Sequence, residues 1–215
     1  MARTREHLID VARQLLPTTG DLSVDAIAAA AGVSVQTLYT HFGSKRGLLM
    51  AVIDSTQRDV GLYVDFDRIW SSPDGETALR GMIEATFRLW AGAWPLVSFS
   101  ERVRWTDPEL ERYMREVDGY RLANLRSITD QLALEGRLLA GIDAAAAADM
   151  AFALSMPAVY QQLAMAREWP LDGVIETMTE VVVVAVVDRA AAVPGTAADW
   201  SGVLRPTEAI RLGEG

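Results

Sequence analysis

Apolar side chains recur every three or four residues along most of the chain, which is the spacing of one face of an α-helix. The first segment with this spacing, residues 5–16, is followed by Pro17 and Gly20, which are typical of a helix end. Its apolar face consists of Leu8, Val11, Ala12 and Leu15. No convincing run of alternating apolar and polar residues is present, so the pattern predicts an all-α fold.

The breaks in this pattern define the later elements. We expect helices over residues 23–31, 34–42, 44–63, 76–94, 107–134, 143–167 and 171–192. Pro157 is expected to kink the helix that contains it, about one turn before itself. The valine-rich stretch 181–187 has strand propensity. However, Ile175, Met178 and Val182 continue the helical spacing and no partner strand is evident, so we assign a helix there.

Two short helices near the N-terminus have the signals of a helix-turn-helix. Ser23 and Ser34 precede them and are good N-caps, since a serine hydroxyl accepts an otherwise unpaired backbone N–H. Apolar pairs flank each cap as hydrophobic staples, Leu22 with Ile27 and Val33 with Leu38. Gly32 lies between the helices and permits a left-handed turn. In such a motif the second helix enters the major groove of DNA.

These residues resemble the TetR family of transcriptional regulators. The resemblance is carried by Ile27-Ala28, Ala31-Gly32-Val33-Ser34, Thr37-Leu38-Tyr39, His41-Phe42, Ser44-Lys45 and Gly47-Leu48-Leu49. Two features depart from the family pattern: the loop from Gly20 to Ser23 is short, and Arg46 stands where an acidic residue is common. The resemblance implies a three-helix DNA-binding domain over residues 1–50 and a helical effector-binding and dimerisation domain over 51–193. Residues 194–215, rich in Gly, Pro and Ala, are expected to form a disordered tail.

The charge distribution agrees with a DNA-binding head. The whole chain has a net charge of −9, yet residues 1–48 carry +1 and the remainder −10. Lys45 is the only lysine, and it lies at the start of a predicted helix, where unpaired N–H groups favour a phosphate. The acidic remainder should repel DNA except where the head docks.

The resemblance places the DNA contacts mainly on and around the second helix of the motif. The candidates are Ser34, Gln36, Thr37, Tyr39, Thr40, His41, Lys45, Arg3 and Arg5. We expect Lys45 and Tyr39 to contact phosphates, Gln36 and Thr37 to contact base edges or phosphates, and His41 to contact the DNA backbone or to cap locally. Arg3 and Arg5 could reach the minor groove as a flexible arm. The alternatives are an ordinary exposed lysine, a tyrosine ring packed on the first helix, and solvated polar side chains.

Large apolar residues gather in the middle of the chain. A subset of them is expected to line a pocket for a small apolar or aromatic effector, since such pockets are mostly apolar. The candidates are Phe87, Trp90, Trp94, Trp105, Tyr113, Phe152 and Met156. For any single ring the alternative is ordinary core. The last helix is expected to supply a homodimer interface through Ile175, Met178, Val182 and Val186, with an intramolecular core as the alternative.

The composition excludes several classes of function. Cysteine is absent and histidine occurs only twice, so thiolate chemistry is excluded and a histidine metal site is not expected. Catalytic motifs, a phosphate-binding loop and a segment of about 20 apolar residues are also missing, so we expect no catalytic residue, cofactor, metal or membrane span, and a cytoplasmic protein.

The sequence therefore predicts a repressor that a small apolar or aromatic effector releases from a palindromic operator in double-stranded DNA. The alternative is an all-helical small-molecule sensor or partner-binding protein with a vestigial DNA head. An enzyme is a weaker reading.

Overall fold

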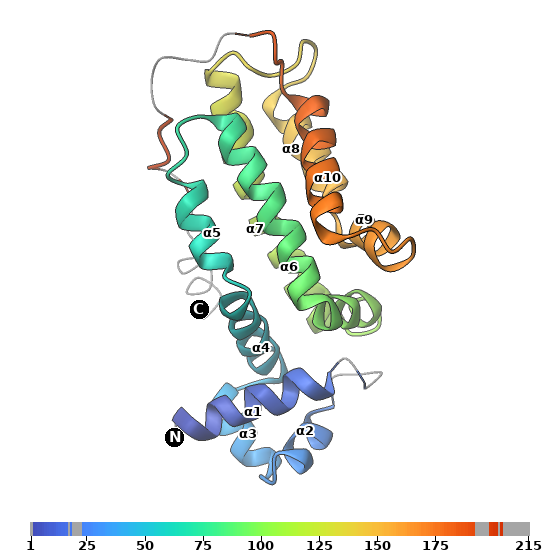
Figure 1. Ribbon diagram of the computed structural model, residues 1–215. Helices are drawn as coiled ribbons and strands as arrows, with labels where there is room; N and C mark the ends of the chain where they lie inside the picture. The colour runs from blue at the N-terminus through green and yellow to red at the C-terminus, as the bar shows by residue number, and fades with distance from the viewer. Residues whose placement is uncertain (1, 17, 19–22, 192–197, 202, 204–215) are drawn as a thin grey trace. The chain divides into compact units, whose positions relative to one another are not determined.

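The computed structural model describes residues 2–16, 18, 23–191, 198–201 and 203, and in these the chain is built from helices, which confirms the all-α prediction. The elements are α1 (Ala2–Leu15), α2 (Val24–Ala30), α3 (Val35–Phe42), α4 (Lys45–Asp59), α5 (Leu62–Ile69), α6 (Gly75–Val103), α7 (Pro108–Leu134), α8 (Ala144–Leu154), α9 (Pro157–Tyr160), a π-helical turn (Gln161–Met165) and α10 (Leu171–Val186) (Figure 1). They divide into two compact units, one from residues 1–60 and 93–116 and the other from 61–92 and 117–215.

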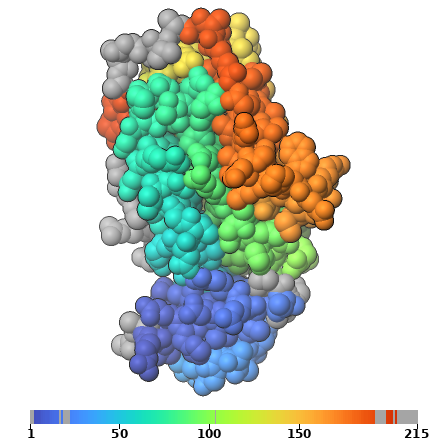
Figure 2. All heavy atoms as spheres, in the orientation of Figure 1, coloured from blue at the N-terminus to red at the C-terminus, as the bar shows by residue number. Residues whose placement is uncertain are grey.

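The first unit contains the predicted head. Helix α1 packs on α2 and α4, and α3 packs on both α2 and α4. Leu8, Ala12, Ile27 and Leu38, four of the apolar residues predicted to pack in this head, are buried, whereas Val11, Leu15 and Phe42 are only partly buried. In the space-filling view, the dark blue residues of α1 and the lighter blue residues of α2 and α3 form one closely packed surface (Figure 2). The head therefore holds α3 on a compact apolar support.

The second unit contains α5, α8, α9 and α10 together with the longer parts of α6 and α7. Helices α8 and α10 lie side by side and pack against each other (Figure 1). Close approach is possible because α8 presents small residues, with Ala147, Ala148 and Ala151 fully buried. The same unit buries Phe87 and Val182 completely.

Two helix boundaries in the middle of the chain differ from the prediction. The segment expected as one helix over residues 44–63 is broken, because Gly61 has φ +79°, a left-handed conformation that a helix cannot contain. Conversely, α6 continues past Pro95 to Val103, although the sequence placed its end at residue 94. Burial of Leu96 and Phe99 after the proline offsets the hydrogen bond that the ring removes.

The segments near the C-terminus also differ. The expected kinked helix over residues 143–167 is interrupted: α8 ends at Leu154, and Pro157 begins α9 as a first-turn proline, a position where its missing N–H costs nothing. Helix α10 ends at Val186 rather than at residue 192, and Val187 is extended and pairs with Leu138 as an isolated bridge. The strand propensity of the valine run is thus expressed at its last residue only.

Part of the predicted disordered tail has defined contacts. The Trp200 ring lies 5.4 Å from that of Trp70, and its Nε1 donates to the carbonyl of Ser72 at 2.9 Å. Most of residues 194–215 lie outside the described residues, as do Pro17 and Gly20, which were predicted to end the first helix, Leu22 of the first staple pair, and all but the last residue of the short loop that ends at Ser23.

Candidate DNA-binding surface and effector site

Helix α3 presents one exposed polar face. Gln36, Tyr39 and Thr40 are exposed and lie at i, i+3 and i+4, so they share that face. Leu38, on the opposite side, is 0% exposed and anchors the helix in the head. Tyr39 is 43% exposed, so the structure favours a solvent-facing ring over one packed on the first helix. This face can reach the edges of bases or phosphate oxygens.

Both predicted N-caps are present. Ser23 Oγ accepts from the N–H of Ala26 at 3.2 Å, and Ser34 Oγ accepts from that of Thr37 at 3.1 Å. The hydroxyls of Ser34 and Thr37 are also 2.9 Å apart, so each restrains the other. Thr40 Oγ1 donates to the carbonyl of Gln36 at 2.8 Å. Gln36 and Tyr39 therefore present the longest polar groups of the face.

Lys45 has a partner that the sequence did not predict. Its Nζ donates to Asp107 Oδ2 at 2.7 Å. Asp107 caps α7, because its Oδ1 accepts from the N–H groups of Glu109 at 3.0 Å and Leu110 at 3.1 Å. The hydrogen bond from Lys45, which outweighs the effect of partial burial, lowers the pKa of Asp107. The proposed phosphate-binding lysine is thus held by a carboxylate in the free chain.

Arg46 makes a second link to α7. Its Nη2 donates to Glu116 Oε2 at 2.5 Å, and its guanidinium lies 5.7 Å from the centroid of the Tyr113 ring. Gly47 allows the first turn of α4 to approach the end of α3, since a Cβ there would lie 2.0 Å from the Phe42 carbonyl oxygen. Steric exclusion of a Cβ therefore explains why glycine occupies this position of the family-like motif.

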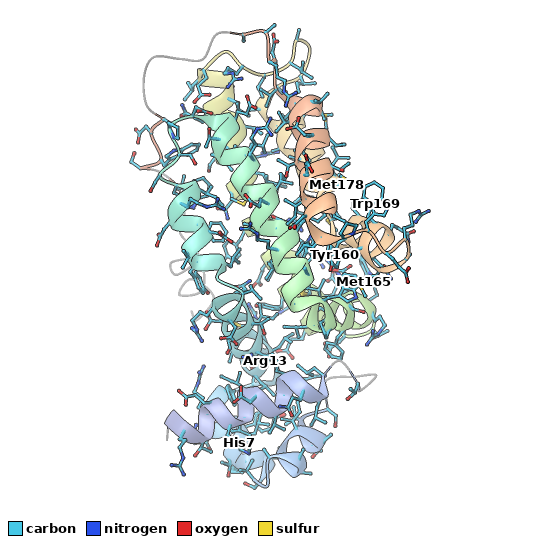
Figure 3. The ribbon with its side chains drawn as sticks, viewed as in Figure 1. His7, Arg13, Tyr160, Met165, Trp169 and Met178 are labelled. Atoms are coloured by element: carbon cyan, nitrogen blue, oxygen red, sulfur yellow. The ribbon has the colours of Figure 1, made fainter. Side chains whose placement is uncertain are left out.

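The remaining predicted DNA contacts have mixed surroundings. Arg3 and Arg5 are exposed but belong to α1, so in the structure they are not a flexible arm. The Arg5 guanidinium lies 5.3 Å from the centroid of the Phe42 ring. His41 is half-buried, with its ring 6.3 Å from that of Phe42. In Figure 3 His7 and Arg13 are labelled on α1, and Arg13 binds Asp59 at 2.5 Å.

The predicted effector residues are divided between the two units. Phe87, Trp90, Phe152 and Met156 belong to the second unit, whereas Trp94, Trp105 and Tyr113 belong to the first. Trp105 is 74% exposed, beside the guanidinium of Arg104, so it lines no enclosed space in the single chain. Tyr113 is buried beside Arg46. The best-grouped candidates are therefore those of the second unit.

Three of these candidates surround Arg121, which the sequence analysis missed. The guanidinium lies 4.0 Å from the centroid of the Phe152 ring and 5.4 Å from that of Trp90. Its Nη2 is 3.1 Å from Met156 Sδ and donates to the Phe152 carbonyl at 3.2 Å. Trp90 Nε1 donates to the carbonyl of Ser155 at 3.0 Å, which fixes the ring. A cation enclosed by aromatic and thioether groups can bind an anionic group on an apolar ligand.

The predicted interface residues of α10 mostly face inward. Met178, Val182 and Val186 are 7%, 0% and 0% exposed, so in the single chain they form core. This burial favours the intramolecular core, the alternative given above, over a dimer interface on this side of the helix. Val181 and Val184, at 41% and 57% exposed, are the large apolar residues on the outer side. Sequence periodicity placed Val181 and Val184 on a second apolar stripe but did not assign the interface to it, because valine occupies both sides of the helix.

Two kinds of feature are not found in the part of the chain that the structure describes. No helix there is long and apolar enough to cross a membrane. No group of three or more His, Asp or Glu side chains is placed to hold a metal ion.

Comparisons with known proteins give one family match and several structural matches. Residues 8–52 match the family described as bacterial regulatory proteins, tetR family. FadR from Bacillus subtilis, solved in complex with stearoyl-CoA, is 22% identical, with a TM-score of 0.68 over 84% of this chain and 98% of that chain. NalD from Pseudomonas aeruginosa, a repressor of a multidrug efflux pump, is 20% identical, with a TM-score of 0.66 over 88% and 100%. A regulator from Saccharomonospora viridis in complex with choline is 18% identical, with a TM-score of 0.60 over 88% and 100%.

A comparison with curated proteins gives no significant match. The structural matches, at these identities, establish the shared fold, while the match at residues 8–52 covers the capped helices, the glycine turn and Lys45. Residues 8–52 therefore match the tetR family of bacterial regulatory proteins, and the chain as a whole shares the fold of solved transcriptional regulators.

Proposed function

We propose that the protein is a homodimeric repressor that leaves a palindromic operator when a small, largely apolar effector binds its second unit. The observation that carries the DNA-binding part is the face of α3, where Gln36, Tyr39 and Thr40 are exposed on a helix anchored by Leu38. A single helix of this size reads few base pairs, so specificity needs two copies about one DNA turn apart, ~34 Å.

The dimer is supported by the outer side of α10. Val181 and Val184 expose apolar surface next to α8, whose outer side carries Met150, 37% exposed. Exposed apolar residues on two helices that pack against each other are suited to a second copy, which would cover them across a twofold axis.

The effector class is supported by the surroundings of Arg121. Aromatic rings and a methionine surround the guanidinium, and its positive charge favours a ligand that carries one acidic group. Stearoyl-CoA and choline, bound by the two relatives named above, differ widely in chemistry, so the fold alone does not select a ligand. We propose an apolar or aromatic compound with a carboxylate or similar anion.

Selection of binding sites from random duplexes tests the DNA-binding part. The wild-type chain should enrich a palindrome. Gln36→Ala should reduce the discrimination between bases at the contacted position by about 1–3 kcal/mol, the range for one good base contact. Asp25→Asn, on the neighbouring helix α2 of the head, serves as a control that should leave the preference unchanged. If the folded wild-type protein enriches no sequence, the proposal that it binds a specific operator is wrong.

The effector is tested with a panel of apolar acids and their uncharged esters. Binding is followed by tryptophan fluorescence and by release of the selected operator. The acid should bind more tightly than its ester, and Arg121→Met should remove that difference while it leaves operator binding intact. Equal binding of acid and ester to the wild-type protein would reject the role of Arg121.

A further inference from the structure

Lys45, the only lysine of the chain, has two possible partners for its ammonium group: a carboxylate of the same chain and a DNA phosphate. In the free protein Lys45 Nζ donates to Asp107 at 2.7 Å. The sequence predicts that a DNA phosphate contacts the same ammonium group. That phosphate would lie beside the Asp107 carboxylate, and two anions a few ångströms apart repel each other. The ammonium group of Lys45 therefore binds either the carboxylate of Asp107 or a DNA phosphate, but not both at once.

Of the two partners, Asp107 is the fixed one. Its Oδ1 accepts from the backbone N–H groups of Glu109 and Leu110 at the start of α7, at 3.0 and 3.1 Å. These bonds hold the carboxylate whether or not Lys45 is present, and the N-terminus of a helix stabilises a negative charge. The carboxylate can thus lose its lysine without being left unsatisfied.

The lysine is the mobile partner. Its side chain is 33% exposed and that of Asp107 is 26% exposed, so water and a phosphate can reach the pair. Lysine also ends in a flexible four-carbon stem, which can redirect the ammonium group without moving α4. The neighbouring Arg46 stays bound to Glu116 and Tyr113, which keeps the start of α4 on α7.

We infer that Asp107 is an internal competitor of the DNA phosphate for Lys45, and that it sets the DNA affinity of the regulator. In the free protein its carboxylate occupies the ammonium group; in the DNA complex a phosphate replaces it, and the backbone N–H groups of α7 retain Asp107. This inference rests on the proposed function, DNA binding, and on the phosphate contact that the sequence predicts for Lys45.

The test compares variants that have the same net charge. Asp107→Asn removes the carboxylate charge, and asparagine remains a good N-cap for α7. Asp107→Ser, which also caps, is the second variant. Glu109→Gln is the matched control, because Glu109 is exposed and lies two residues away, and its replacement changes the net charge equally. Each is also made in a Lys45→Ala background.

Fluorescence anisotropy with a labelled duplex at several salt concentrations gives the affinities. We expect both Asp107 variants to bind more tightly than Glu109→Gln, by about two- to fivefold for each docked Lys45, the range of a partly exposed ion pair. In the Lys45→Ala background this excess should disappear. Equal affinities for Asp107→Asn and Glu109→Gln would overturn the inference.

Denaturant unfolding without DNA provides a second readout. Asp107→Asn should be slightly less stable than the wild type, because it loses the ion pair, and yet bind DNA more tightly. A purely structural role would lower both stability and affinity, and that result would also overturn the inference. If Lys45→Ala binds DNA as tightly as the wild type, Lys45 contacts no phosphate, and the inference is wrong while the proposed function stands. If the folded wild-type protein binds no duplex even at low salt, the proposed function is wrong as well.

Discussion

The same substitution at neighbouring positions of α10 distinguishes interface from core. Val181 and Val184 are 41% and 57% exposed, whereas Val182 between them is 0% exposed. We expect the double variant Val181→Glu/Val184→Glu to fold as a monomer. The single variant Val182→Glu should instead fail to fold stably, although it lies on the same turn of the same helix.

The exposed fractions set the magnitude. Together the two outer valines expose about the area of one whole side chain, and burying one valine stabilises by roughly 1.5 kcal/mol, or about 3 kcal/mol for two subunits. Loss of this stabilisation raises the dissociation constant of a dimer by roughly a hundredfold, before the repulsion between the introduced carboxylates is added. At Val182 a carboxylate would be placed in the core, at a cost of several kcal/mol against a total stability of about 5–15 kcal/mol.

Light scattering during size-exclusion chromatography, over a range of protein concentrations, gives the oligomeric state, and circular dichroism gives the melting temperature. The control is Val64→Glu, the same substitution at a residue of α5 that is 73% exposed. The control should remain a dimer. The interface assignment is wrong if the double variant stays dimeric at the concentrations at which the wild type does, or if Val64→Glu dissociates equally.

Three further outcomes are expected. Gly61→Ala should destabilise by about 1–2 kcal/mol because φ is +79° there, whereas Gly119→Ala, inside α7 with nothing within 4 Å of the added carbon, should stabilise by ~0.5–1 kcal/mol; denaturant unfolding measures both. Gly47→Ala should unfold the head at a lower temperature, seen by circular dichroism, since the added carbon meets a backbone oxygen at 2.0 Å. Burial alone would raise the pKa of Glu76, but hydrogen bonds from Arg80 and Arg137 lower it below the ordinary value of a glutamate. The stabilisation from this carboxylate is present above the ordinary glutamate pKa and is lost as the pH falls through the lowered value, so the stability of Glu76→Gln against denaturant should decline less steeply than that of the wild type as the solution is acidified.

The local features of the head were predictable because their partners are near in sequence. Ser23, Ser34 and Asp107 each accept from an N–H three residues on, and such capping depends on residue type and position alone. The apolar residues Leu8 and Leu38 were assigned to the core from helical spacing, and both are 0% exposed. Short-range hydrogen bonds and periodicity therefore define the DNA-binding motif.

The other assignments depended on contacts distant in sequence. Asp107 lies 62 residues from Lys45, and no local pattern connects them. Arg121 was passed over because arginine is normally a surface residue, yet here two aromatic rings enclose its guanidinium. On α10 valine occupies two stripes of the helix, so the spacing alone did not show that the stripe of Val182 is buried and that of Val184 exposed.

The ion pairs of the head bear on how it recognises DNA. Of its basic residues, Arg13, Lys45 and Arg46 bind Asp59, Asp107 and Glu116, so much of the positive charge counted from the sequence is neutralised within the chain. Non-specific binding of DNA depends on such charges, and the acidic remainder of the chain opposes it. The exposed face of α3 must then supply most of the attraction. We therefore expect a low affinity for unrelated duplexes, a large ratio of specific to non-specific binding, and a salt dependence that increases when Asp107 releases Lys45.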